Sequence, residues 1–157
     1  MTERESTESA ERRVQGFIDK FAPEHQRVLR EARGLLRARF PTAYELVYDN
    51  YNFFVLGYSP TERPSDSIIS ITGGASGIGL CFIRGVGLPD PHEILLGGGK
   101  QTRFIRLPSA DVLSRPEVRH LIDAAEARSG VAMRQDGEVE LIIRSVSANQ
   151  RPRQKPG

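Results

Sequence analysis

The chain has 157 residues, a length that suits one domain built around a single hydrophobic core. Its 38% hydrophobic and 27% charged residues are typical of ordinary globular proteins, and a net charge of +2 does not imply a polyanionic partner. One cysteine excludes an intramolecular disulfide, and no apolar run approaches the roughly 20 residues that a membrane helix needs. We therefore expect a cytoplasmic protein that spans no membrane.

Helical periodicity covers the first forty residues. Apolar residues at helical spacing predict one helix from Ser9 to Phe21 and a second from Pro23 to Phe40. The opposite side of the second helix, expected to be solvated, carries Arg27, Arg30, Arg33 and Arg37. For the whole chain we expect a disordered tail over residues 1–8, one domain over residues 9–149, and a mobile, basic, proline-rich tail over residues 150–157.

From Ala43 onward the periodicity becomes that of strands. The predicted strands cover residues 43–49, 52–58, 67–72, 80–84, 102–107 and 139–146. Pro116 begins a last helix that Gly130 is well placed to end. Because strands that follow one another without intervening helices form antiparallel sheets, we predict an α+β fold. It has an antiparallel sheet of about five to six strands with helices packed on one face.

Residues 71–80 read ITGGASGIGL and resemble the cofactor-binding glycine loop of short-chain dehydrogenases. In that family the loop follows the first parallel strand and lets the backbone approach a pyrophosphate at a helix N-terminus. Here about seventy residues precede the motif, a strand follows it, and no tyrosine has a lysine four positions on. We therefore interpret Gly73 to Gly79 as a turn between two strands and expect no cofactor.

A second resemblance extends over residues 11–153. Its motifs are Tyr48-x-Asn50-Tyr51, Gly85-x-Gly87-Leu88-Pro89-Asp90-Pro91, Leu95-Leu96-x-Gly98-x-Lys100-x-x-Arg103-x-Ile105, Ile143 to Ser147, and Gln150 to Arg153. In these motifs the chain resembles the YdhG-like family of domains of unknown function. The resemblance implies a frataxin-like two-layer sandwich. It also brings in iron binding by analogy, because some members are regarded as frataxin-like iron chaperones.

Iron would need clustered oxygen or nitrogen ligands, which frataxins present along the first helix and the adjoining sheet edge. The acidic residues in the corresponding region, weak candidates for metal ligands, are Glu8, Glu11, Asp19, Glu45 and Asp49. Arg12, Arg13 and Lys20 are interspersed among them and neutralise the ridge. Iron binding is therefore the alternative hypothesis and not the main one.

The main candidate for a ligand site follows a triple glycine. Gly97, Gly98 and Gly99 would expose backbone N–H groups beside Lys100 and Arg103, and this combination favours a carboxylate or a phosphate. At the first predicted hairpin, the residues that could line the same pocket are Tyr48, Asn50 and Tyr51. The alternative is a glycine turn whose cations lie in water, or whose arginine holds the loop by pairing with Asp90.

Catalytic motifs are missing. A hydrolytic triad needs a nucleophile with a histidine in reach, yet His25, His92 and His120 belong to no recognisable motif. Cys81, alternating with apolar neighbours on a strand, is interpreted as a small core residue. We therefore predict a non-catalytic module that binds a small anionic ligand or an interaction partner, without a nucleic-acid partner; homo-oligomer formation stays open.

Overall fold

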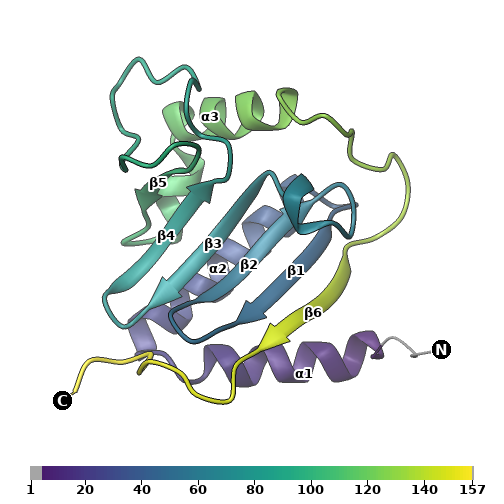
Figure 1. Ribbon diagram of the computed structural model, residues 1–157, viewed down its shortest axis with the longest axis vertical. Coiled ribbons are helices and arrows are strands. Elements are labelled where there is room, and N and C mark those ends of the chain that lie inside the picture. The colour runs from purple at the N-terminus through teal and green to yellow at the C-terminus, as the bar shows by residue number, and fades with distance from the viewer. Residues whose placement is uncertain (1–4, 157) are drawn as a thin grey trace.

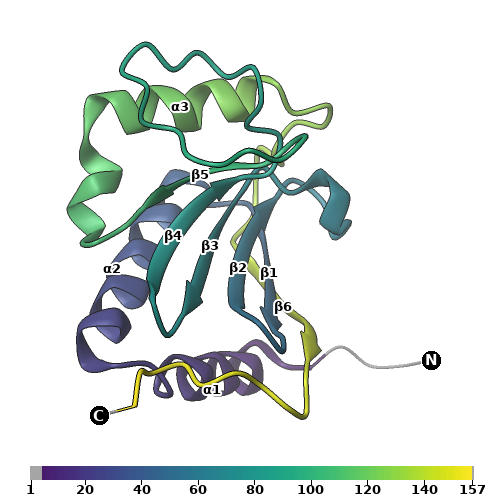
Figure 2. The ribbon, with the colours of Figure 1, turned by 60° about the vertical axis from the view of Figure 1, so that its left-hand side comes forward.

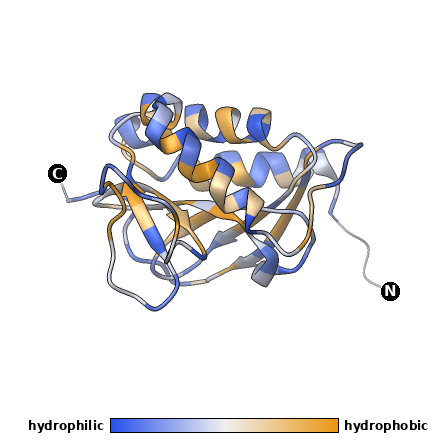
Figure 3. Ribbon diagram, turned by 90° about the horizontal axis from the view of Figure 1, so that it is seen from above, coloured by the Kyte–Doolittle hydropathy of each residue, from blue (hydrophilic) through white to orange (hydrophobic). Residues whose placement is uncertain are grey.

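A computed structural model describes residues 5–156 of the chain (Figure 1). The described residues form three helices: α1 (Thr7–Ile18), α2 (Pro23–Arg39) and α3 (Pro116–Ala127). The strands are β1 (Tyr44–Asp49), β2 (Phe54–Ser59), β3 (Ile69–Gly74), β4 (Gly77–Phe82), β5 (Arg103–Arg106) and β6 (Glu140–Val146). The helices form one layer and the sheet the other (Figure 3), which confirms the predicted α+β class with helices on one face.

The sheet has the strand order β5-β4-β3-β2-β1-β6. Strands β1 to β5 pair antiparallel, whereas β6 pairs parallel with β1, so the sheet is mixed and not purely antiparallel as predicted. Helix α3 and the segment after it carry the chain back to the end of the sheet where β1 begins (Figure 1). A connection that contains a helix is long enough to join strands that run in the same direction.

The helix boundaries follow local capping. The hydroxyl Oγ of Ser6 accepts a hydrogen bond from the backbone N of Ser9 at 3.2 Å, so α1 begins at Thr7, two residues earlier than predicted. Residues 6–8 therefore belong to this helix or to its cap, while residues 1–4 of the predicted tail lie outside the described residues. Pro23 occupies the first turn of α2 as predicted, because its missing N–H has no partner to lose there.

The core lies between the helices and the sheet. Among its largest fully buried side chains are Phe21, Phe54, Tyr58 and Phe82, each of which stabilises the fold by about 1.5–3 kcal/mol through burial. Gly73 is required at this interface, since a Cβ there would lie 3.0 Å from Cδ1 of Ile78 and 3.1 Å from the Phe21 ring. Packing therefore explains one of the glycines in the dehydrogenase-like motif.

The same motif forms a tight antiparallel hairpin. Gly73 pairs with Ile78 and Gly74 with Gly77, so the strands extend into the glycines and only Ala75 and Ser76 form the turn. The segment after Gly79 continues as a strand. This geometry agrees with the interpretation as a link between two strands, and it lacks the helix N-terminus that a dinucleotide loop requires.

The other side of the sheet carries no helix, and we call it the uncovered face; the viewer looks onto it in Figure 1. Side chains alternate between the two sides of a strand, so a buried apolar side chain on the helix side is followed by a residue on the uncovered face. On β3 and β4 the residues of the uncovered face are Ser70, Thr72, Gly74, Gly77, Gly79 and Cys81. These residues are all small.

The C-terminal segment passes beneath the β1–β2 turn and along α1 (Figures 1 and 2). A mobile end was expected, but Arg153 is only 3% exposed and binds the β1–β2 region. No helix within residues 5–156 combines the length and the apolar character needed to cross a membrane.

Candidate functional site

A hollow of about 640 Å³ opens on the uncovered face at the β3–β4 hairpin. Its lining on this face comprises Phe53, Thr72, Ser76, Gly77, Gly79, Cys81, Phe104 and Arg106. The hollow continues past the ends of β4 and β5 to Glu24 and His25 in the first turn of α2. The volume falls within the roughly 300–1,000 Å³ of pockets that take small molecules.

Strand pairing explains why the floor of the hollow is low. Thr72 pairs with Gly79 and Gly79 with Arg106, so these three residues share one row across the sheet. Paired residues on neighbouring strands project to the same face, and a glycine in such a row leaves a gap between its neighbours. The next row places Ser70 beside Cys81, another pair of small side chains.

Two aromatic side chains stand at the sides of this floor. The Phe53 ring lies 3.3 Å from the position that a Cβ on Gly74 would take, and Phe53 is 51% exposed. On the other side Phe104 is half-buried, and its backbone exchanges two hydrogen bonds with Leu96, at 2.8 and 3.0 Å. The floor therefore runs between a ring on the β2 side and a ring on the β5 side.

Arg106 supplies the positive charge of the hollow. Its side chain is exposed, and its guanidinium carbon lies 5.9 Å from the centroid of the Phe104 ring. Within residues 5–156 its guanidinium has no hydrogen bond and no ion pair. The residues paired across the sheet in line with Arg106 and with Phe104 include no carboxylate. From β6 to β5, the row of Arg106 consists of Ser145, Tyr48, Val55, Thr72, Gly79 and Arg106. The row of Phe104 consists of Ile142, Leu46, Gly57, Ser70, Cys81 and Phe104. This cation is therefore available to an anion.

Cys81 lies on the uncovered face and is half-buried, so the prediction of a small core residue is wrong. Its Sγ lies 3.4 Å from Oγ1 of Thr72, a distance at which either atom can donate a hydrogen bond. On the far side of the hollow, Nδ1 of His25 is buried without a hydrogen-bond partner among the described residues. The polar atoms that border the hollow thus come from both layers of the fold.

The predicted anion site at the triple glycine lies at the opposite end of β5 from Arg106. Gly97, Gly98, Gly99 and Lys100 are exposed. Arg103 folds back on this loop, and its Nη1 donates to the backbone oxygens of Gly99 at 2.6 Å and Thr102 at 2.8 Å. The arginine thus holds the loop through carbonyl groups.

Asp90 holds the preceding part of the same loop. Its carboxylate accepts hydrogen bonds from the backbone N of Ile94 at 2.9 Å and of Leu95 at 3.0 Å. The alternative in which Asp90 pairs with Arg103 is thus not realised in this structure. Both polar side chains instead satisfy backbone groups of the loop, which sets its shape.

The hairpin residues predicted to join that site do not meet it. Arg103 lies in the row of Phe82, Ile69, Tyr58 and Glu45, whereas Asn50 and Tyr51 follow the other end of β1. Glu45 and Asp49 are four residue steps apart on this strand, or about 13 Å. Tyr48 lies on the uncovered face two strands away from Thr72, in the row that ends at Arg106.

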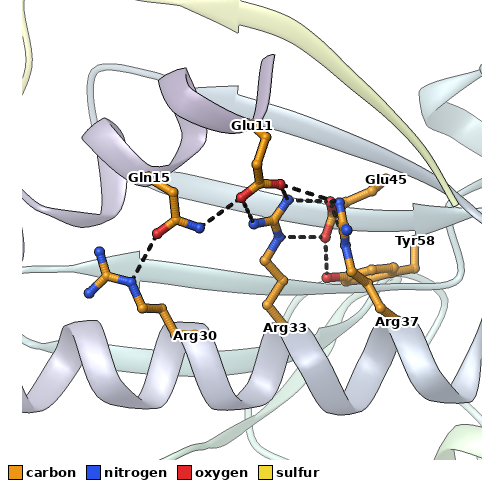
Figure 4. Close-up of polar contacts among 7 residues, drawn as sticks. All are labelled: Glu11, Gln15, Arg30, Arg33, Arg37, Glu45 and Tyr58. Atoms are coloured by element: carbon orange, nitrogen blue, oxygen red, sulfur yellow. Dashed lines mark hydrogen bonds and ion pairs between the residues drawn. The ribbon is translucent and has the colours of Figure 1, made fainter. Parts of the chain in front are cut away.

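The acidic residues proposed as metal ligands belong to ion pairs. Glu45 is fully buried and accepts hydrogen bonds from Arg33, Arg37 and the hydroxyl of Tyr58 (Figure 4). Glu11 on α1 binds the same Arg33 through two bonds of 2.7 and 2.8 Å. Arg33 is only 6% exposed, so the prediction of a fully solvated arginine face on this helix is wrong.

This cluster shifts the pKa of its members. Burial alone would raise the pKa of Glu45, but the hydrogen bonds from Arg33 and Arg37 outweigh it and hold the pKa below its usual value. Burial and the adjacent Glu45 carboxylate raise the pKa of Tyr58 well above its ordinary value. Glu45 is therefore ionised and Tyr58 neutral at physiological pH.

Asp49 forms a second cluster at the other end of β1. It binds Lys20, in the turn after α1, and, at 2.9 Å, Nη2 of Arg153, which also donates to the backbone oxygen of Asn50. Burial opposes ionisation of Asp49, yet the hydrogen bonds from Lys20, Gln150 and Arg153 hold its pKa below the usual value. The tail thus supplies part of the counter-charge for a buried aspartate.

Of the remaining metal candidates, Asp19 pairs with Arg30 at 2.6 Å and Glu8 is exposed on α1. A smaller cavity of about 190 Å³ brings His92 together with Glu117 and His120, which are distant in sequence. Nevertheless, the described part of the chain holds no group of three His, Cys, Asp or Glu side chains placed to bind a metal ion.

The residues around the hollow were missed at the sequence level, although the sequence contains a signal for them. In β3 and β4, large apolar residues alternate strictly with small ones, as in Ile69-Ser70-Ile71-Thr72 and Ile78-Gly79-Leu80-Cys81. Such a period-two pattern of large and small residues predicts a packed face and a low, open one.

Comparison with known proteins gives no match: no protein-family model, no curated protein and no solved structure is significantly similar to this chain.

Proposed function

We propose that this protein is a non-catalytic binding module whose uncovered sheet face takes a small molecule carrying an anionic group. The observation that carries the proposal is an arginine, Arg106, with no ion pair among the described residues, beside a hollow of about 640 Å³. The anion expected from the sequence is retained, but its binding site moves from Lys100 and Arg103 to the face that Arg106 borders.

The chemistry of the lining supports the binding of a small molecule. Phe53 and Phe104 provide apolar surface, while Thr72 and Ser76 provide hydroxyl groups. Ligand pockets are typically mostly apolar with a few polar groups that fix orientation. A guanidinium is suited to a carboxylate or phosphate because its planar donors match the geometry of these anions.

Iron binding has no comparable support. Glu11 and Glu45 share Arg33, and Asp49 faces Lys20 and Arg153, so each of these carboxylates already has a cationic partner. The resemblance to the YdhG-like family, whose function is unknown, is compatible with a binding module and does not specify its ligand.

The test uses two anions of different shape, naphthoate and octanoate, titrated into the protein labelled for amide NMR. We expect at least one of them to shift the amide signals of Thr72, Gly79 and Phe104. Arg106→Gln should weaken this binding about fivefold, the upper range for a solvent-exposed charge pair. Arg115→Gln is the matched control, because Arg115 is also exposed and lies outside the hollow.

Two outcomes would contradict the proposal. One is the absence of shifts with either anion at millimolar concentration. The other is a set of shifts confined to Gly97, Lys100 and Arg103, which would return the site to the loop predicted from sequence.

A further inference from the structure

The geometry points to a planar aromatic anion as the ligand of the hollow: an aromatic ring system that lies on the glycine floor between Phe53 and Phe104 while its carboxylate or phosphate meets Arg106. This inference rests on the proposed function and adds the class of ligand. It depends on the flatness of the floor, on the two rings beside it and on the position of the charge.

The floor is flat because two of its residues are glycines, which carry no side chain. Gly77 and Gly79 occupy alternate positions of β4, and both line the hollow. Nothing lies within 4 Å of the position that a Cβ on Gly77 would take, so this part of the floor is open. A saturated, puckered ring touches such a surface at a few atoms, whereas a planar ring makes contact over its whole face.

The two phenylalanine rings set the width of the floor. Phe53 lies over Gly74 of β3, and Phe104 belongs to β5, two strands away. Neighbouring strands are about 4.8 Å apart, which separates the two positions by about 10 Å across the strands. The four residue steps from Gly77, opposite Gly74, to Cys81, opposite Phe104, add about 13 Å along them. A floor of this extent accommodates one ring system in edge-to-face or offset contact with either phenylalanine, the arrangements that aromatic pairs prefer.

The charge lies at the β5 side of the same floor. Arg106 is in the row of Gly79, and its guanidinium carbon is 5.9 Å from the centroid of the Phe104 ring. An anionic group attached to a ring on the floor can therefore reach the guanidinium. The strand residues paired in line with Arg106 and Phe104 include no carboxylate, and Glu24, which also lines the hollow, belongs to the first turn of α2 and not to the sheet.

The experiment compares ligands matched in all but one property. Naphthoate and decalin carboxylate have the same carbon skeleton and charge, but only the first is planar; naphthamide keeps the ring and removes the charge. We expect naphthoate to bind about fivefold more tightly than decalin carboxylate, a factor typical of an aromatic contact beyond its buried area. Naphthamide should bind the wild-type protein more weakly than naphthoate does. To the Arg106→Gln variant the two ligands should bind with equal affinity.

Protein variants identify the surface that selects the ring. Phe53→Leu should reduce the preference for naphthoate over decalin carboxylate, while leaving the fold intact because half of Phe53 is exposed. Phe104→Leu is the second variant and tests the other ring. Both are checked for an unchanged amide spectrum before titration.

Two further comparisons distinguish a nucleotide from an aromatic carboxylic acid as the ligand. Binding of adenosine monophosphate is compared with that of ribose phosphate, and both are compared with binding of naphthoate. Tight binding of the nucleotide alone assigns the site to nucleotides, and tighter binding of naphthoate assigns it to aromatic acids. If decalin carboxylate or ribose phosphate binds as tightly as its aromatic counterpart, the aromatic class is wrong while the anion-binding function stands. If no anion depends on Arg106, the proposed function itself fails.

Discussion

Substitution of Glu45 is the sharpest test of how the fold is held together. The side chain is fully buried and accepts hydrogen bonds from two arginines and from Tyr58. Glu45→Gln keeps the volume but removes the negative charge, and it turns an acceptor into an amide that presents N–H groups to other donors. Arg33 would then depend on Glu11 alone for its counter-charge.

The size of the loss follows from what remains after the substitution. Breaking a buried ion pair by removing one partner typically costs about 3–5 kcal/mol. The Arg37 side chain is 33% exposed and can turn to water, and the Glu11 side chain, 36% exposed, still binds Arg33. We therefore expect the lower limit, about 3 kcal/mol. For a protein of this size that loss corresponds to a decrease of roughly 6–12 °C in melting temperature.

Urea denaturation followed by circular dichroism measures this loss. Glu31→Gln serves as the control, because Glu31 pairs with Arg27 on the exposed side of α2 and should contribute less than about 1 kcal/mol. A double-mutant cycle with Arg37→Gln separates the pairwise coupling from the cost of the unpaired charge. A loss below about 1 kcal/mol for Glu45→Gln would refute the reasoning, since a carboxylate with these partners cannot then be important to the fold.

Three further predictions concern pH, the tail and the loop. Because the pKa values of Glu45 and Asp49 are lower in the folded than in the unfolded protein, their contribution should be complete above about pH 5 and should be lost as the pH falls, measurable as a falling urea midpoint. Arg153→Gln should cost about 2 kcal/mol, less than a complete buried pair because Lys20 still binds Asp49. The control Arg151→Gln, which loses only an exposed contact with the Tyr51 ring, should cost less than about 1 kcal/mol. Asp90→Ala should accelerate hydrogen exchange at the backbone amides that its carboxylate binds, and unchanged protection there would contradict the assigned hydrogen bonds.

Elements that depend on residues close together in the sequence could be predicted. The apolar stripes gave the helices, and Pro23 marked the first turn of α2, because helical periodicity and the geometry of proline act within a few residues. The alternation in β1 to β5 likewise gave consecutive antiparallel strands. The parallel pairing of β6 with β1 could not be predicted, because it depends on where α3 and the following segment deliver the chain.

Partners distant in sequence were also beyond prediction. Arg33 was assigned to a solvated face with three other arginines, and nothing in the helix itself distinguishes it from Arg30. Its burial depends on Glu45, which β1 places beneath it. In the same way, the sequence places Arg153 in the C-terminal tail. Arg153 becomes buried only because Asp49, at the last position of β1, binds its guanidinium.

The two faces of the sheet separate stability from binding, although alternate residues of the same strands encode both. In β3 and β4, Ile71 and Leu80 belong to the core, while their neighbours Thr72 and Gly79 line the hollow. Exposed positions such as Arg106 can therefore be substituted within about 0.5 kcal/mol of the original stability. A bound ligand, in contrast, would stabilise the folded state by about 2.7 kcal/mol at a concentration one hundred times its dissociation constant. An anion that raises the unfolding free energy of the wild-type protein but not of Arg106→Gln must consequently act on the uncovered face, since the core of the two proteins is the same.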